Sequence, residues 1–214
     1  MREFLEGIRK QRPAALTGKI MRTILILLLG NALGALSKFL DCTASNALPP
    51  ILEYLDVRNF LGRFAIWILL GLCIAVYSPS PACAAISVFA FFFGMVASYY
   101  AYSKWIAGFF PQSYVLVWVG FTVVSPLLAW ICWYAKGKEK ISMGISAVII
   151  AVLFNVAFVY GWFYFNMHSI LELITFLCSV TVLRRSSVKE TMLMVAMGIA
   201  AALLLRLVIP FHFW

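Results

Sequence analysis

The chain has 214 residues, of which 64% are hydrophobic and only 12% are charged. Soluble globular domains are about 45–50% apolar and about one quarter charged, so this chain lacks the polar side chains that a soluble globule needs on its surface. The mean hydropathy is +0.98, and seven apolar stretches recur along the sequence. These features predict an all-α, polytopic integral membrane protein with one transmembrane domain over residues 1–214.

The net charge of +9 does not indicate nucleic-acid binding in a protein of this class. Cytoplasmic loops of membrane proteins are rich in Lys and Arg, which explains the positive charge without a nucleic-acid partner. The five cysteines form no CxxC pair, and most of them lie within apolar stretches, as small buried side chains do. We therefore expect no disulfide framework, no metal site and no cofactor.

Residues 1–19 form a basic N-terminal segment. The sequence is compatible with two structures for it, a short helix on the membrane surface or a solvated tail. The first crossing is predicted over residues 20–40. A basic start before an apolar run is also found in signal peptides, but here the run continues into polar positions, which favours an uncleaved helix. Residues 42–59 follow as an extracytoplasmic loop, in which Pro49 and Pro50 favour the start of a short surface helix.

The six further crossings are predicted over residues 60–77, 82–103, 113–134, 141–164, 168–183 and 190–209. Pro126 lies inside the fourth crossing, where a membrane helix tolerates it as a kink. A very tight turn over residues 166–168 joins the fifth crossing to the sixth. The terminal sequence FHFW, with His212, is expected at the membrane interface.

The distribution of basic residues predicts the orientation. If the N-terminus is cytoplasmic, twelve of the seventeen Lys and Arg residues fall on the inner side. The five on the outer side are Lys38, Arg58, Arg63, Lys104 and Arg206. The same assignment places both basic loops, 136–140 and 184–190, inside, which favours seven crossings over six. We expect a protein of the cell (plasma) membrane, with its N-terminus inside and its C-terminus outside.

A polar stripe runs along one face of the second half of the first crossing. Asn31, Gly34, Lys38 and Asp41 are spaced so that one face of a helix carries all four. Such a face is expected to turn toward other helices or water, because polar groups are unfavourable in lipid. Gly30 and Gly34 form a GxxxG pattern, which favours close packing against a second helix. Lys38 and Asp41 are close enough along the helix to pair with each other.

Glu172 lies about one turn into the sixth crossing. A carboxylate at that depth is unfavourable unless it is protonated or paired with a cation. Its candidate partners are His168, one turn earlier, and Arg63 or Arg206 from other crossings. The functional interpretation is a proton relay or a binding group in an outward-facing cavity, and the structural one is an ion pair that locks two helices.

These patterns favour a transporter of a small solute or an ion, or the membrane substrate-binding subunit of one. Its polar cavity is expected between crossings one, two, six and seven. The candidate binding residues are Asn31, Lys38, Asp41, Arg63, His168, Glu172 and Arg206. The sequence contains no HExxH, GxSxG or Walker motif, so no catalytic residue is assigned.

Two alternatives to transport stay open at this point. One is a non-transporting accessory, sensor or immunity subunit, whose polar groups only lock the bundle. The other is an intramembrane enzyme that acts on a lipid or a peptide. The expected partners are the lipid bilayer, a small polar solute or cation, and either partner subunits or a second copy of the chain.

Overall fold

The computed structural model describes residues 2–44, 47–161 and 163–208. The protein is 79% helical, which establishes the all-α class. The chain forms two compact units. Unit 1 comprises residues 1–10, 54–73 and 134–214, and unit 2 comprises residues 11–53 and 74–133. His212 and residue 209 of the last expected crossing lie outside the described residues.

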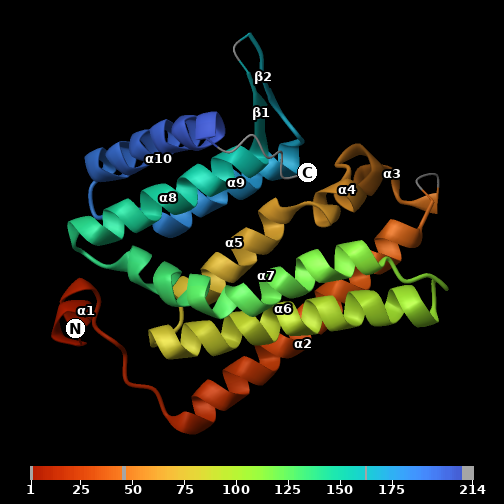
Figure 1. Ribbon diagram of the computed structural model, residues 1–214, viewed down its shortest axis with the longest axis horizontal. Helices are drawn as coiled ribbons and strands as arrows, with labels where there is room; N and C mark the ends of the chain where they lie inside the picture. Colours follow the sequence, from red (N-terminus) through yellow and green to blue (C-terminus); the bar gives the residue numbers. More distant parts are fainter. Residues whose placement is uncertain (1, 45–46, 162, 209–214) are drawn as a thin grey trace. The chain divides into compact units, whose positions relative to one another are not determined.

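Unit 2 contains three long helices, α2 (Leu16–Cys42), α6 (Pro81–Trp105) and α7 (Gln112–Trp133). Helix α6 packs against both α2 and α7 (Figure 1). It starts sharply, because the Ser80 hydroxyl accepts a hydrogen bond from the Cys83 N–H and Pro81 occupies the first helical position. The short helix α3 (Pro50–Tyr54) begins at a proline, as the sequence predicts.

Helices α2 and α6 approach closely at their glycines. A Cβ added to Gly30 would lie within 3.0 Å of the Phe91 carbonyl oxygen, and one added to Gly34 would meet the Met95 carbonyl oxygen in the same way. Gly94 of α6 makes an equally close approach to the backbone of α2. The GxxxG pattern of α2 is therefore a packing surface, which confirms the expectation from the sequence.

Unit 1 is built mainly around α8 (Lys140–Ala157), which packs against α9 (Ile170–Leu183) and α10 (Val188–Val208) (Figure 1). The remaining elements are α1 (Arg2–Ile8), α4 (Val57–Gly62), the first part of α5 (Phe64–Val76), and the short 3-10 helix η2 (Tyr134–Lys136). Strands β1 (Phe158–Tyr160) and β2 (Phe165–Met167) pair antiparallel, with Phe158 opposite Met167.

This hairpin corrects two predictions. The fifth crossing ends as a helix at Ala157 rather than near residue 164, and residues 165–167 form a strand instead of part of a tight turn. Aromatic side chains favour a pleated strand, and this segment is dense in them. The rings of Phe158 and Phe165 stack with centroids 5.3 Å apart, and Phe154 and Phe176 extend the cluster to α8 and α9.

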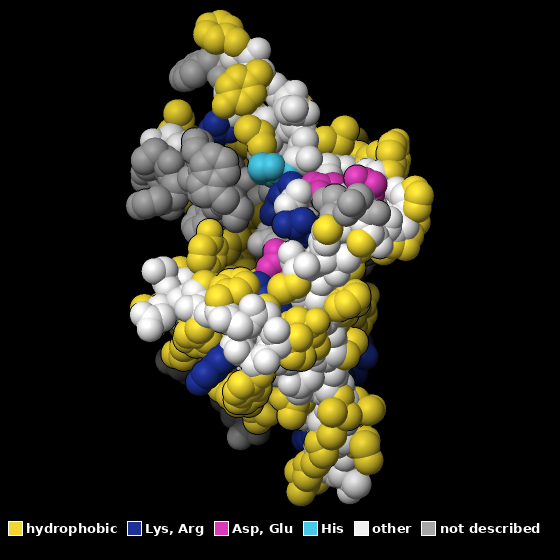
Figure 2. Space-filling view, turned by 90° about the vertical axis from the view of Figure 1, so that its right-hand side faces the viewer, with side chains coloured by type: hydrophobic (Ala, Val, Ile, Leu, Met, Phe, Trp, Pro, Cys, Tyr) yellow, Lys and Arg dark blue, Asp and Glu magenta, His cyan; other side chains and the backbone are white. Residues whose placement is uncertain are grey.

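Within the described residues, five helices are long and apolar enough to cross a membrane. They are α2, α6, α7 continued through η2, α8 and α10. Many of their large apolar side chains are exposed, including those of Leu25, Val123 and Leu204, and hydrophobic side chains recur over the face drawn in Figure 2. Apolar surface on this scale requires lipid around it, so the protein is embedded in a membrane.

Two apolar helices are too short to cross alone. Helix α5 has 13 residues and α9 has 14, which gives lengths of about 20 Å and 21 Å at 1.5 Å per residue. The hydrocarbon core of a bilayer is about 30 Å thick. Helix α5 is short because the second apolar stretch breaks between α4 and α5, at Arg63.

The glycine packing gives a first testable prediction. Replacing Gly34 by Ala should lower the free energy of unfolding by about 1–3 kcal/mol, because the new methyl group forces α2 and α6 apart. The matched control is Gly120→Ala in α7, where nothing lies within 4 Å of the added Cβ. Thermal unfolding in detergent micelles measures both variants. Equal melting temperatures would contradict the close approach of α2 and α6.

Candidate functional site

The break between α4 and α5 places the Arg63 side chain. Arg63 follows the last residue of α4 in an extended conformation, with φ −97° and ψ 166°, and α5 begins at the next residue. The indole N–H of Trp67 in α5 donates to the Leu61 carbonyl of α4 over 2.9 Å. This bond satisfies a carbonyl that the end of α4 leaves open, and it fixes the two helices around Arg63.

Glu172 lies in the first turn of α9, and its exposed fraction is 0%. One carboxylate oxygen accepts a hydrogen bond from Arg63 Nη1 over 2.7 Å, and the other accepts one from the Ser169 hydroxyl. Ser169 is the residue before α9 and has an extended backbone. The S-x-x-E spacing is that of a capping box, but here the two side chains bond to each other, which orients Glu172 toward Arg63.

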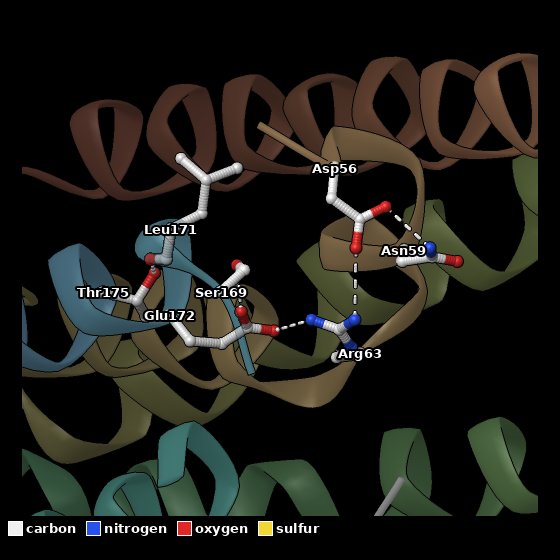
Figure 3. Close-up of polar contacts among 7 residues, drawn as sticks. All are labelled: Asp56, Asn59, Arg63, Ser169, Leu171, Glu172 and Thr175. Carbon is white, nitrogen blue, oxygen red and sulfur yellow. Dashed lines mark hydrogen bonds and ion pairs between the residues drawn. The ribbon is translucent and has the colours of Figure 1, made fainter. Parts of the chain in front are cut away.

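The Arg63 guanidinium contacts a second carboxylate as well. Its Nη2 lies 3.3 Å from Asp56 Oδ2, and the other Asp56 oxygen accepts from Asn59 Nδ2 over 2.6 Å. Asp56 has a φ of 52°, a left-handed conformation that Asp adopts more readily than most residues. Figure 3 shows the guanidinium between the two carboxylates. We call these five residues the Arg63–Glu172 cluster: Asp56, Asn59, Arg63, Ser169 and Glu172.

The charges within this cluster do not balance. One guanidinium faces two carboxylates, so the three ionised groups carry a formal charge of −1. A fully buried carboxylate is stable only when it is paired and hydrogen-bonded, and Glu172 meets both conditions. The unbalanced negative charge makes the cluster attractive to a proton or a small cation.

His168 lies beside the cluster, in the link between β2 and α9. Burial lowers its pKa from the ordinary value of 6.5, and the nearby Arg63 lowers it further, while Glu172 acts in the opposite direction. The imidazole is therefore mainly neutral at pH 7 and adds little positive charge. Its backbone N–H donates to the Ala157 carbonyl over 3.3 Å, which ties the start of α9 to the end of α8.

Arg206 occupies a different part of unit 1. Its guanidinium carbon lies 4.3 Å above the ring centre of Tyr160. The Tyr160 hydroxyl donates to Asn155 Oδ1 over 2.6 Å, and Asn155 Nδ2 donates to the Ala202 carbonyl of α10. Among the described side chains, the partner of Glu172 is thus Arg63, and the contact of Arg206 is aromatic.

The three remaining candidate residues belong to unit 2. Lys38 is only 2% exposed, and its Nζ lies 2.6 Å from Asp41 Oδ2. The same ammonium lies 4.4 Å from the ring centre of Phe109 and 5.0 Å from that of Tyr99, which is typical of cation–π contacts. The local pairing of Lys38 with Asp41 is confirmed. Asn31 Nδ2 donates to the carbonyl one turn earlier, where α2 meets Gly94 of α6.

Sequence reasoning did not select Asp56, Asn59 or Ser169. The S-x-x-E spacing before an apolar run is a recognisable signal for Ser169, whereas nothing local marks Asp56 as a partner of Arg63. Over the described residues, no group of three or more His, Cys, Asp or Glu side chains is arranged to hold a metal ion. Comparison of the chain with models of known families, with curated proteins and with solved structures finds no match.

The ion pair predicts unequal effects for its two partners. Arg63→Gln should lower the free energy of unfolding by about 3 kcal/mol, because it leaves a buried carboxylate without a cation. Glu172→Gln should lower the free energy of unfolding by less, since Arg63 keeps its ion pair with Asp56 and the amide oxygen of the new side chain still accepts a hydrogen bond. Denaturant titrations in detergent measure both. A larger loss for Glu172→Gln would contradict this account of the charges.

The pKa of His168 predicts a pH dependence. As the pH falls through about 6.5, the unfolded chain takes up a proton at this histidine before the folded protein does, so stability falls with falling pH. Melting curves recorded from about pH 7.5 to about pH 5.5 should show this loss in the wild type and a flatter profile in His168→Gln. Parallel profiles for the two proteins would show that His168 is not the group responsible.

Proposed function

We propose that this membrane protein moves a small polar solute or an ion across the bilayer, with the Arg63–Glu172 cluster as its binding group. One observation carries the proposal. An ion pair between a buried carboxylate and a partly buried guanidinium lies where two helices too short to cross the bilayer alone, α5 and α9, both begin. Interrupted helices whose ends meet inside the membrane are the binding sites of many secondary transporters.

The helix ends support a binding role because of their free backbone groups. The first N–H groups of a helix have no partner inside it, and the N-terminus carries partial positive charge. Helix α9 begins with Glu172 in its first turn, where that charge favours the carboxylate. Helix α5 begins directly after Arg63. Polar groups are costly in lipid, so such ends suit a place where water or a solute enters.

The two carboxylates around Arg63 support a mechanism with two states. A proton or a small cation that binds at Glu172 neutralises the carboxylate and weakens its bond to Arg63. The guanidinium keeps its second partner, Asp56, so the exchange leaves no charge unpaired. A ligand shifts an equilibrium only by binding one state more tightly, and the loss of the Arg63–Glu172 bond provides such a difference.

We also propose the number of crossings and the orientation that the sequence predicts. The protein has seven crossings in one transmembrane domain of the plasma membrane, with the N-terminus in the cytoplasm. The second crossing, residues 60–77, contains α5 together with the end of α4, and the sixth, residues 168–183, contains α9. The excess of Lys and Arg on the inner side supports this orientation. The cluster then lies toward the outer side. We still predict that four further residues are polar contacts for the solute, namely Asn31, Lys38, Asp41 and Arg206.

A second candidate function has an observation in its favour. Both carboxylate oxygens of Glu172 already accept hydrogen bonds, and Lys38 is enclosed by Asp41 and two aromatic rings. Groups that are satisfied in this way also suit a non-transporting accessory subunit whose ion pairs lock the fold. The two functions differ in whether Glu172 ever exchanges its partner.

Proton flux into liposomes tests the transport proposal. The purified protein is reconstituted with the dye pyranine inside, and potassium with valinomycin imposes a negative interior potential. A second set of vesicles carries a sodium gradient, and both are measured with and without an added mixture of amino acids and polyamines. The wild type should admit protons or exchange them for sodium above the level of empty liposomes, and Glu172→Gln should abolish this flux.

The matched control is Glu190→Gln, which removes an exposed carboxylate from the first turn of α10 and should leave the flux unchanged. Flux equal to that of empty liposomes in every set, from a folded wild-type protein, would contradict transport and favour the accessory subunit. Equal flux in wild type and Glu172→Gln would contradict the assignment of the site.

A further inference from the structure

Four basic residues gather at the C-terminal end of α9, the end opposite to Glu172. They are Arg9, Lys136, Arg184 and Arg185, here called the basic cluster. They come from three separate places in unit 1: the residue after α1, the 3-10 helix η2, and the link between α9 and α10. Lys136 Nζ donates to the Arg184 carbonyl, and Arg185 Nη1 donates to the carbonyl of Ala135, the residue before Lys136, which brings these three residues together. The charge of Arg9 also acts on Lys136. The fold therefore brings together cations that are distant in the sequence.

The cluster is built into the fold rather than solvated on loops. Lys136 Nζ donates to the Val182 carbonyl over 2.8 Å and to the Arg184 carbonyl over 3.4 Å. Arg185 Nη1 donates to the Ala135 carbonyl over 3.2 Å, and its backbone N–H donates to the Thr191 hydroxyl. The bonds from Lys136 satisfy carbonyls at the end of α9, the bond from Arg185 satisfies one in η2, and both side chains are half-buried.

Three members of the cluster have charges that no ion pair within the described residues matches. None of the ion pairs that join described residues involves Lys136, Arg184 or Arg185. Like charges held close together and partly withdrawn from water repel each other more strongly than solvated ones. An anion from outside the chain would reduce that repulsion, and the exposed side chain of Arg184 is accessible to such an anion.

The surroundings of the cluster indicate what that anion is attached to. The two helices that leave the link at Arg184 and Arg185 both expose apolar side chains. On α10 the side chain of Val188 is 76% exposed and that of Met192 is 67% exposed, and Leu177 of α9 is also exposed. A ligand that fits both features has an anionic head and long hydrocarbon chains. Basic pockets of this kind at the membrane surface bind acidic phospholipid headgroups.

We propose that the basic cluster binds the phosphate headgroup of an acidic phospholipid, whose acyl chains lie along the exposed apolar faces of α9 and α10. The site is distinct from the Arg63–Glu172 cluster and does not depend on the proposed transport. The general excess of basic residues on the cytoplasmic side does not account for it, because other lysines near the same link and turn, Lys140 at the start of α8 and Lys189 in the first turn of α10, are simply exposed.

Native mass spectrometry of the detergent-solubilised protein tests the site with single lipid molecules. Phosphatidylglycerol and phosphatidylcholine with identical acyl chains are titrated separately, and inorganic phosphate forms a third arm. The wild type should bind phosphatidylglycerol more tightly than phosphatidylcholine, and phosphate alone weakly. Arg184→Gln/Arg185→Gln should lower the affinity for phosphatidylglycerol about 30-fold, and leave that for phosphatidylcholine unchanged.

The matched control is Lys140→Gln/Lys189→Gln, which removes two exposed charges and should leave the affinity for phosphatidylglycerol unchanged. If the first double variant fails to fold, the single change Arg184→Gln affects an exposed side chain and should lower the affinity about fivefold. Equal binding of the two lipids by the wild type, equal losses in the two double variants, or phosphate binding as tight as that of phosphatidylglycerol would each overturn the proposal.

Discussion

A carboxylate that water does not reach has to find its counter-charge within the fold, and Glu172 imposes this constraint on unit 1. Its exposed fraction is 0%, so Arg63 and the Ser169 hydroxyl must approach it directly. Arg63 is available because α4 ends one residue before it and α5 begins one residue after it. A continuous helix through this stretch would place Arg63 on a regular helical face. The break and the ion pair therefore belong together.

The surrounding elements hold this arrangement in place. Rings of Phe158 and Phe165 in the hairpin pack with Phe154 and Phe176 of the adjoining helices, which fixes the start of α9. Helix α9 also has favourable charges at both ends. Glu172 lies near its positive N-terminus, and Lys136 donates to carbonyls at its negative C-terminus. A short helix fixed in this way can carry a binding group at one end and meet a lipid headgroup at the other.

Local patterns in the sequence were sufficient for the helical class, for the glycine packing of α2 and for the pairing of Lys38 with Asp41, because each depends on spacing along one helix. They did not predict the hairpin, since an aromatic apolar run is compatible with both helix and strand until its packing partners are known. The sequence proposed Arg63 and Arg206 as alternative partners of Glu172. Choosing between them required the position of the α4–α5 break, which depends on contacts such as Trp67 with Leu61.

A double-mutant cycle measures whether Arg63 and Glu172 stabilise each other in the folded protein. The free energies of unfolding of Arg63→Met, Glu172→Met and the double variant are compared with the wild type in the same detergent. We expect the double variant to be more stable than the sum of the single losses implies, by about 1–3 kcal/mol, because the second change removes the unpaired charge left by the first. Additive losses, within about 0.5 kcal/mol, would show that the two side chains do not interact in the folded protein.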